Sequence, residues 1–279
     1  MDTTPLLVVG GGNMGSAIIA GALSGGLLQS SDLAAIETDE LKRQTLFEEH
    51  GIACFARADE GMNWLHGRES GESQGQVLLA VKPQSLPAAA EALSLHSDRS
   101  RVVITILAGT PGSRVHAALP RSRVVRAMPN LAMRVHQGAT AVCLSAGAHP
   151  GDEDFALQIF GIDGQLVVRI EESMMDAFTA LAGSGPGYVF FLAEAMQEAA
   201  VKMGFDPATA LDVVRETVAG AAALLAESFV DPAGLRDAVT SKGGTTAAAM
   251  SVLHDAGVMQ AWVRAIVAAR DRGREIAAG

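Results

Sequence analysis

The sequence predicts two domains of different class: an α/β domain with a doubly wound parallel sheet over residues 1–170, followed by an all-α domain over residues 171–279. Length is the first indication, because 279 residues correspond to roughly two domains of about 150 residues each. The second is that short, continuously apolar runs alternate with helical patterns up to residue 170, as in parallel sheets covered by helices on both faces. The third is that only helical patterns follow.

The strands expected in the first domain are short runs rich in Val, Ile, Leu and Ala. They fall at residues 6–10, 33–36, 52–55, 77–81, 102–107, 123–127, 139–144 and 166–170. Helical patterns between them predict the covering helices. These are expected over residues 13–24, 40–49, 87–93, 113–119 and 152–160, with one more between the strands at 52–55 and 77–81. The polar, glycine-rich segment 66–76 predicts a mobile loop before the fourth strand.

The second domain is expected to consist of helices separated by Gly- and Pro-containing breaks. These breaks are GSGPG at 183–187, FDP at 205–207, DPAG at 231–234 and TSKGGT at 240–245. One helix contains an uncharged stretch, TVAGAAALLA at 217–226, and a helix that is apolar all round must be covered on every side. The domain is too small to enclose this helix alone, so the sequence predicts a homodimer through the C-terminal helices.

Composition excludes several classes of partner and location. A net charge of −10 and only 4% aromatic residues argue against nucleic-acid binding. There is no uninterrupted apolar stretch of about 18 residues, so no membrane span is expected. Asp2 and a short apolar run do not resemble a signal peptide. Two cysteines, Cys54 and Cys143, without a CxxC or His/Cys cluster indicate a reducing, cytoplasmic environment and no metal site.

A glycine motif follows the first strand, where GGGNMG satisfies G-x-G-x-x-G. Gly10 would allow a tight turn, Gly12 the approach of a pyrophosphate, and Gly15 close packing of helix against strand. Amides at the helix N-terminus would hold the phosphates. This pattern predicts a Rossmann-like dinucleotide site, against the alternative of a purely structural turn. The predicted phosphate-binding turn consists of Gly10, Gly11, Gly12, Asn13, Met14 and Gly15.

An acidic residue, Glu37, ends the second strand about 20 residues after Gly15, where dinucleotide-binding folds place a ribose acceptor. A carboxylate there would repel a 2′-phosphate, so the sequence favours NADH over NADPH. The alternatives are that Glu37 is a solvated loop acid, and that Lys42 and Arg43 soften the repulsion.

Further cofactor contacts are expected where other strands end, since ligands of open α/β sheets lie at the carboxyl ends of strands. RAMPN at 126–130 follows a strand in the same way, and Lys82 taken alone could be an ordinary exposed loop lysine. The candidates after the strands at 77–81 and 102–107 are Ala80, Val81, Lys82, Pro83, Ala108 and Gly109.

The TSKGGTT segment offers a second candidate site. Gly243 and Gly244 precede a helix and leave its backbone amides unobstructed, which suits a carboxylate. Hydroxyls lie beside them, and Thr245 or Thr246 is expected to cap the helix. The alternative is helix punctuation, as for GSGPGY at 183–188. The candidate substrate-binding residues are Ser241, Gly243, Gly244, Thr245 and Thr246.

Five motifs in this order, GGGNMGSAI, AVKP, RAMPN, GSGPGYVF and TSKGGTT, resemble the pyrroline-5-carboxylate reductases over nearly the whole chain. The resemblance implies NAD(P)H-dependent reduction of 1-pyrroline-5-carboxylate to L-proline. It implies helical domains that interlock into dimers, and larger rings such as decamers. Ser241 and the turn 243–246 would bind the substrate carboxylate, with Thr246 near the ring nitrogen as the catalytic residue. Residues 80–83 and 108–109 would line the cofactor.

The sequence departs from the family pattern at several positions. Lys242 stands where proline is common, Gly187 where alanine is frequent, and Ala58 near an asparagine that contacts the cofactor in some members; the 66–76 loop is long. A β-hydroxyacid dehydrogenase is the second hypothesis, but it needs a lysine in the first interdomain helix, where only the distal Lys202 is found. A non-enzymatic nucleotide-sensing or assembly protein is the third, although TSKGGTT is intact.

Overall fold

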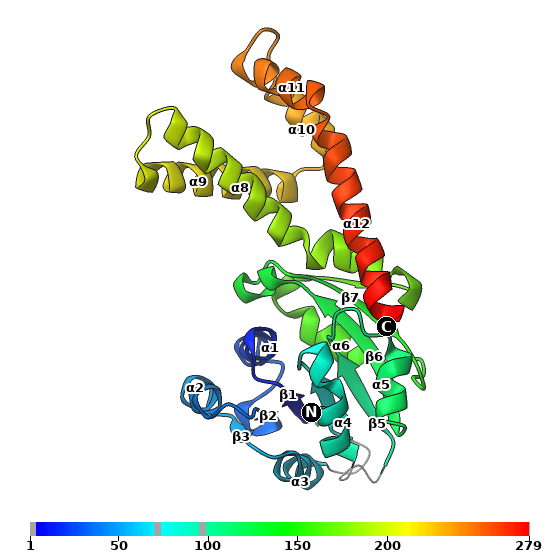
Figure 1. Ribbon diagram of the computed structural model, residues 1–279. Helices are drawn as coiled ribbons and strands as arrows, with labels where there is room; N and C mark the ends of the chain where they lie inside the picture. The colour runs from blue at the N-terminus through cyan, green and yellow to red at the C-terminus, as the bar shows by residue number, and fades with distance from the viewer. Residues whose placement is uncertain (1–3, 70–73, 95–98, 279) are drawn as a thin grey trace. The chain divides into compact units, whose positions relative to one another are not determined.

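The computed structural model describes residues 4–69, 74–94 and 99–278 (Figure 1). The chain forms two compact units, one of Met1–Ser184 with Ala269–Gly279 and one of Gly185–Ala268. The predicted boundary between residues 170 and 171 lies inside the first unit, which continues to Ser184. The sequence after residue 170 shows no strand pattern, but its helical residues Met175 and Ala180 are buried in the first unit. In the predicted 66–76 loop, the chain is helical to Arg68 and residues 70–73 lie outside the described residues.

The first unit contains one eight-stranded sheet in the order β3-β2-β1-β4-β5-β6-β7-β8. The first six strands are parallel, with the doubly wound arrangement that the sequence predicts. The strands are β1 (Leu6–Val9), β2 (Leu33–Ile36), β3 (Ala53–Phe55), β4 (Gln76–Leu79), β5 (Arg101–Thr105), β6 (Ser122–Pro129), β7 (Ala139–Leu144) and β8 (Leu166–Arg169).

The prediction of a wholly parallel sheet is wrong for the last two strands. β7 pairs antiparallel with β6, and β8 pairs parallel with β7. A parallel neighbour requires a long crossover, whereas the link from β6 to β7 holds only a short 3₁₀ turn, η3 (Leu131–Val135). The chain therefore reverses direction at Asn130.

Helices cover both faces of the sheet, since the strands bury alternate residues on opposite sides. Leu6 and Val8 pack with α1, α2 and α6, and Leu7 and Val9 pack with α3, α4 and α5. The helices of this unit are α1 (Asn13–Ser24), α2 (Glu40–His50), α3 (Ala58–Arg68), α4 (Leu86–Ser94), α5 (Gly112–Ala118), α6 (Asp154–Phe160) and α7 (Met175–Phe178). The predicted α/β class is confirmed.

The second unit is all-helical, as predicted. Its helices are α8 (Gly185–Lys202), α9 (Pro207–Glu227), α10 (Pro232–Ala238), α11 (Thr245–Asp255) and the start of α12 (Val258–Ala278). Asp206 and Asp231 cap α9 and α10 by accepting hydrogen bonds from the first-turn amides, and a proline follows each cap. The GSGPG segment differs from the prediction, because Ser184 keeps helical dihedrals between a π-helical turn (Thr179–Gly183) and α8.

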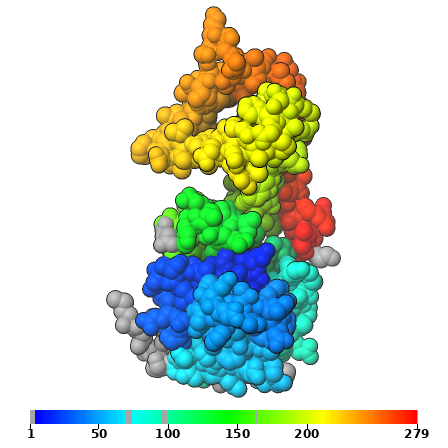
Figure 2. Space-filling view, turned by 90° about the vertical axis from the view of Figure 1, so that its left-hand side faces the viewer, coloured from blue at the N-terminus to red at the C-terminus, as the bar shows by residue number. Residues whose placement is uncertain are grey.

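Apolar side chains of the second unit are mostly exposed in the single chain. Within residues 185–268, all of which the structure describes, the buried apolar side chains are Ala200, Ala210 and Val214. By contrast, Phe190 is 61% and Leu224 66% exposed. Figure 2 shows the helices coloured yellow to orange with their sides open to solvent. In the described part of the chain, no helix is long and apolar enough to span a bilayer.

Candidate active site

The turn after β1 meets the steric requirements that predicted three glycines. Gly10 has a φ of +105°, and a Cβ there would lie 2.7 Å from the carbonyl oxygen of Ala80. A Cβ at Gly15 would lie 2.0 Å from the Gly10 carbonyl oxygen, whereas a Cβ at Gly12 would meet nothing within 4 Å. Gly10 and Gly15 are therefore needed by the fold, and Gly12 leaves open space above the start of α1.

The other residues of this turn have different surroundings. The Gly11 amide donates to Oε2 of Glu37 over 2.8 Å. Asn13 is exposed at the first position of α1, and Met14 is half-buried against the sheet. Of these three, Gly11 is therefore the residue with a hydrogen bond to the predicted ribose acceptor.

Glu37 is held firmly at the end of β2. Besides the Gly11 amide, the Asp39 amide donates to Oε1 over 2.9 Å. Arg43, predicted as a group that could soften repulsion of a 2′-phosphate, donates instead to the main-chain oxygens of Glu37 and Thr38, both over 2.8 Å. The carboxylate thus has a fixed position, and the Arg43 guanidinium supports the backbone that carries it.

A cavity of about 470 Å³ lies over the carboxyl ends of β1, β2 and β4. It brings together Gly10, Gly12, Glu37, Ala80, Val81 and Lys82, all predicted from the sequence. Pro83 begins the 3₁₀ turn η2 (Pro83–Ser85) without lining the cavity. Ser85 and three alanines of α4 also line it, and sequence reasoning missed them because nothing marked which face of α4 looks toward the turn.

The Ala108–Gly109 turn after β5 is not among the residues that line this cavity. Gly109 has a φ of +62°, and a Cβ there would lie 2.7 Å from Ile276. The end of α12 therefore packs against this turn within the first unit.

The TSKGGTT segment forms a glycine-dependent turn in the second unit. Gly243 has a φ of +74°, and the Gly244 amide donates to the Ser241 carbonyl over 3.0 Å. A Cβ at Gly244 would lie 2.3 Å from Ser241 Oγ, so this hydroxyl lies against the turn. The expected cap is wrong: Gly244 is the N-cap, and Thr245 and Thr246 are the first two residues of α11. Extended backbone at Gly244, without a side-chain cap, leaves the first amides of α11 accessible.

Family models match both parts of the chain. A model described as NADP oxidoreductase coenzyme F420-dependent matches residues 6–109, and one described as pyrroline-5-carboxylate reductase dimerisation matches residues 172–276. A pyrroline-5-carboxylate reductase of Methanosarcina acetivorans is 35% identical over 99% of both chains. The chain belongs to the pyrroline-5-carboxylate reductase family. The membership predicted from five motifs is confirmed.

Other members of the reductase family are also similar to this chain over nearly its whole length. The Thermus thermophilus enzyme is 35% identical over 97% of this chain and 98% of its own. A solved pyrroline-5-carboxylate reductase from Coxiella burnetii superposes with a TM-score of 0.85 at 30% identity, covering 98% of each chain. A Plasmodium falciparum structure with NADP bound shares the fold, with a TM-score of 0.83 at 22% identity over 99% of each chain. The dimerisation match indicates that this reductase oligomerises.

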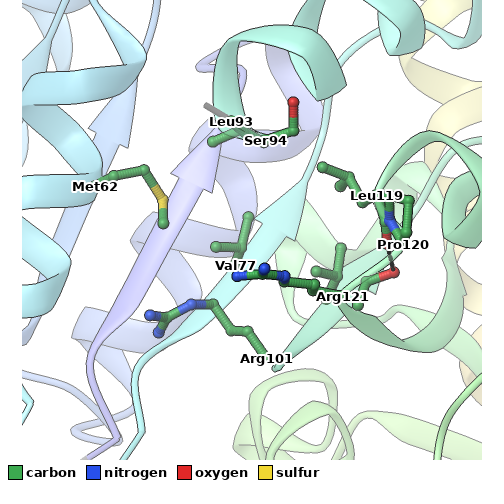
Figure 3. A pocket seen from close by; sticks show the side chains of 10 residues that line it. Met62, Val77, Leu93, Ser94, Arg101, Leu119, Pro120 and Arg121 are labelled. Atoms are coloured by element: carbon green, nitrogen blue, oxygen red, sulfur yellow. Dashed lines mark hydrogen bonds between the residues drawn. The ribbon is translucent and has the colours of Figure 1, made fainter. Parts of the chain in front are cut away.

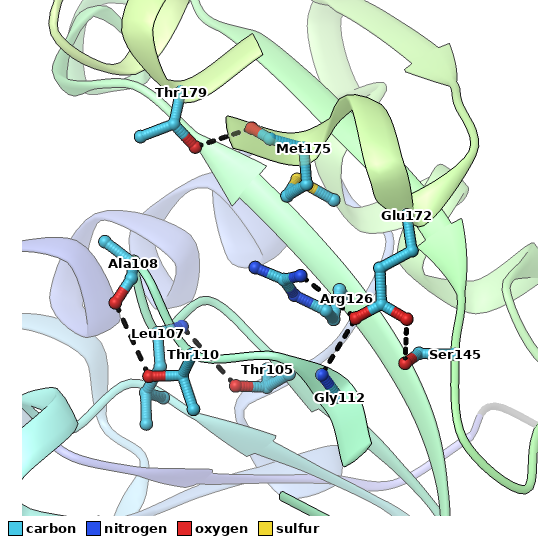
Figure 4. A network of polar contacts seen from close by, with 10 residues as sticks. All are labelled: Thr105, Leu107, Ala108, Thr110, Gly112, Arg126, Ser145, Glu172, Met175 and Thr179. Carbon is cyan, nitrogen blue, oxygen red and sulfur yellow. Dashed lines mark hydrogen bonds and ion pairs between the residues drawn. The ribbon is translucent and has the colours of Figure 1, made fainter. Parts of the chain in front are cut away.

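A buried polar network that sequence reasoning missed lies in the first unit of this reductase (Figure 4). Glu172 Oε1 accepts hydrogen bonds from the Gly112 amide over 2.8 Å and from Arg126 Nη1 over 3.0 Å, and Oε2 accepts one from Ser145 Oγ over 2.5 Å. Arg126, the first residue of RAMPN, is buried. The carboxylate thus joins β6, the end of β7 and the start of α5.

Asn130, the last residue of RAMPN, holds the chain where β6 ends. Its Nδ2 donates to the Ala182 carbonyl over 3.1 Å, and its Oδ1 accepts from the Ala139 amide over 3.3 Å. RAMPN therefore joins β7 and the π-helical turn to the sheet.

The two thiols have no sign of nucleophilic chemistry. Burial raises the pKa of Cys54 to about 11 and that of Cys143 to about 11, so both are protonated near neutral pH.

Proposed function

We propose that this protein catalyses the NAD(P)H-dependent reduction of 1-pyrroline-5-carboxylate to L-proline. The observation that carries the proposal is the intact Ser241–Thr246 turn, with accessible helix amides, in a member of this reductase family that matches a relative over 99% of both chains. The test is oxidation of NADH or NADPH in the presence of 1-pyrroline-5-carboxylate, with 3-hydroxyisobutyrate oxidation as the control reaction.

The first unit fits a nicotinamide dinucleotide. The space above Gly12 accepts a pyrophosphate, the amides at the start of α1 face it, and the fixed Glu37 carboxylate can accept from a ribose hydroxyl. The cavity volume is within the range of about 300–1,000 Å³ common for ligand sites. When bound, the reduced dinucleotide supplies the hydride.

The second unit would position the substrate. A protonated cyclic imine is already an electrophile, so its reduction depends on placement more than on a strong acid. The amides at the start of α11 and the Ser241 hydroxyl would bind the carboxylate, and the Thr246 hydroxyl would donate a hydrogen bond or relay a proton to the ring nitrogen.

Thr246→Ala should lower kcat/KM for 1-pyrroline-5-carboxylate about 10- to 10³-fold, the usual effect of removing a positioned hydrogen-bond donor. Thr246→Ser should recover most of this loss because it keeps the hydroxyl. Thr45→Ala, which removes an exposed threonine hydroxyl from α2, is the matched control and should leave kcat/KM unchanged. An unaltered kcat/KM in Thr246→Ala would refute the role of its hydroxyl.

We further propose that NADH is preferred, because the fixed Glu37 carboxylate repels a 2′-phosphate. Glu37→Ser should shift the ratio of kcat/KM values for NADPH and NADH toward NADPH by about tenfold or more, equivalent to about 1.4 kcal/mol. Glu37→Gln keeps an acceptor for the Gly11 amide while it removes the charge. Because the Plasmodium falciparum structure holds NADP, kcat/KM must be measured with both NADH and NADPH. A strong preference of the wild type for NADPH would exclude the proposal.

The proposed assembly is a homodimer through the C-terminal helices, which can build larger rings such as a decamer. Exposed Phe190 and Leu224 support this surface, since large exposed apolar patches mark interfaces. Light scattering should give a dimer or a multiple of it, and a stable monomer at micromolar concentration would contradict the assembly. Two free cysteines support a cytoplasmic location.

A further inference from the structure

The final turn of α12 packs against the turn that follows β5. A Cβ at Gly109 would lie 2.7 Å from Cγ2 of Ile276 and 3.2 Å from its Cβ. Gly109 has a φ of +62° and is buried, whereas Ala108 beside it is exposed. The Ile276 side chain therefore fills the space toward which a side chain at position 109 would point, and it covers the backbone there.

The hydrogen bonds inside the turn after β5 are long. In Figure 4, the Thr110 hydroxyl donates to the Ala108 carbonyl over 3.4 Å. The Leu107 amide donates to the Thr105 hydroxyl over 3.4 Å, and the Thr110 amide donates to the Leu107 carbonyl over 3.3 Å. Hydrogen bonds in proteins usually span about 2.5–3.2 Å. Because these three bonds are longer, they fix the turn weakly, and the packing of Ile276 adds to its support.

Two further contacts place the end of α12 within the first unit. Gly273 faces α7, where a Cβ at this position would lie 3.4 Å from Oδ1 of Asp176. The Arg114 guanidinium of α5 donates to the Ala277 carbonyl over 3.4 Å. The helix end is therefore placed by contacts before and after Ile276 in the sequence, so this side chain stays over the turn.

The turn that Ile276 covers lies at the edge of the sheet where a dinucleotide is expected. It follows the carboxyl end of β5, and ligands of open α/β sheets lie at this edge. The cavity lined by Val77 and Arg101 in Figure 3 lies at the opposite edge, at the amino ends of β4, β5 and β6. Ala108 and Gly109 are two of the cofactor contacts that the sequence predicts. Ile276 therefore contacts the predicted cofactor site from behind the turn.

We propose that Ile276 is a positioning residue for the nicotinamide dinucleotide, because its side chain holds the Ala108–Gly109 backbone where the cofactor meets it. This inference rests on the proposed function, which requires that cofactor. Ile276 is also the last residue of the segment that matches the dimerisation model, residues 172–276. That segment therefore supports the nucleotide site as well as the assembly.

Ile276→Ala should raise the dissociation constant for NADH about tenfold, since a displacement of about 1 Å can cost about 100-fold and a turn that keeps its own hydrogen bonds shifts less. Fluorescence titration without the imine measures this constant. KM for NADH should rise with it while kcat stays within about twofold, because the loss affects the ground and transition states equally. Ile276→Val keeps Cβ and Cγ2, the atoms that face Gly109, and should bind NADH like the wild type.

Three further measurements separate positioning from loss of stability. Ile276 is 44% exposed, so the Tm of Ile276→Ala should stay close to that of the wild type. Glu275→Gln changes an exposed neighbour that pairs with Arg272 over 2.7 Å, and it should leave NADH binding unchanged. Arg114→Gln removes the donor to the Ala277 carbonyl and should weaken NADH binding by a smaller factor than Ile276→Ala.

An unchanged dissociation constant for NADH in Ile276→Ala, or a rise of similar size in Ile276→Val or Glu275→Gln, would overturn the proposal. A wild-type protein that binds neither NADH nor NADPH would overturn this inference together with the proposed function. Binding of NADH without reduction of 1-pyrroline-5-carboxylate would reject the proposed reaction alone, and the dissociation constants of the variants would still decide the role of Ile276.

Discussion

Replacing Gly15 by alanine should weaken dinucleotide binding by about 100-fold or more, because a displacement of about 1 Å in a binding site can have an effect of this size. The new Cβ would lie 2.0 Å from the carbonyl oxygen of Gly10, and this neighbour is backbone that cannot rotate away. α1 must therefore move from the turn, and the amides at its N-terminus, which we propose bind the phosphates, move with it. The dissociation constant for NADH, measured by fluorescence or calorimetry, and the Tm should both change.

Two glycine variants separate effects on folding stability from effects on dinucleotide binding. Gly12→Ala adds a Cβ into open space, so Tm should remain close to that of the wild type while dinucleotide binding weakens. Gly21→Ala, on the same helix and also without neighbours within 4 Å, should preserve binding and raise stability by about 0.5–1 kcal/mol. Normal binding by Gly15→Ala or by Gly12→Ala would contradict the assignment of this turn.

Glu172→Ala should destabilise the protein by about 2–4 kcal/mol, the range for removing one partner of a largely buried charged network. The change leaves the buried Arg126 guanidinium, the Gly112 amide and the Ser145 hydroxyl without their shared acceptor. The carboxylate is about two-thirds buried, so solvent reduces the loss below that of a fully buried pair. Urea unfolding at one fixed protein concentration measures this loss of stability. The free energy of unfolding of Glu172→Gln should lie between the values for Glu172→Ala and the wild type.

The same network predicts a pH dependence. Burial raises the pKa of Glu172, but hydrogen bonds from Ser145, Gly112 and Arg126 outweigh burial and bring the pKa below its ordinary value of 4.5. The contribution of the carboxylate is therefore complete above pH 4.5 and is lost as the pH falls through the lowered pKa of the folded state. The stability difference between wild type and Glu172→Ala should narrow in acid, and a constant difference down to the lowest pH at which both fold would contradict the account.

Local sequence patterns were sufficient for the parts of the molecule that depend on neighbours in the chain. The turn from Gly10 to Gly15, the position of Glu37 and the helix breaks at 205–207 and 231–234 all follow from residues close together in sequence. The Glu172 network could not be predicted in this way. Its partners lie 27, 46 and 60 residues away, and only the fold brings them together.

The direction of a strand was the other feature that local sequence patterns did not predict. An apolar run such as residues 139–144 indicates a buried strand, but it carries no information on which way the strand runs. The missing crossover helix after β6 was the available signal, since residues 130–138 are too few for one. The helix cap at Gly244 was misplaced for a related reason, because threonine and glycine are both acceptable caps and backbone dihedrals decide between them.

The last helix makes the first unit discontinuous in sequence. α12 begins in the second unit and ends in the first, where Ile276 packs against Gly109 and the Arg114 guanidinium donates to the Ala277 carbonyl over 3.4 Å. A gene fragment that stops after residue 184 would therefore lack part of its own domain. An isolated nucleotide-binding unit requires residues 4–184 joined by a designed linker to residues 269–278. A premature stop codon within α12 would therefore destabilise the first unit, although most of that unit is encoded before it.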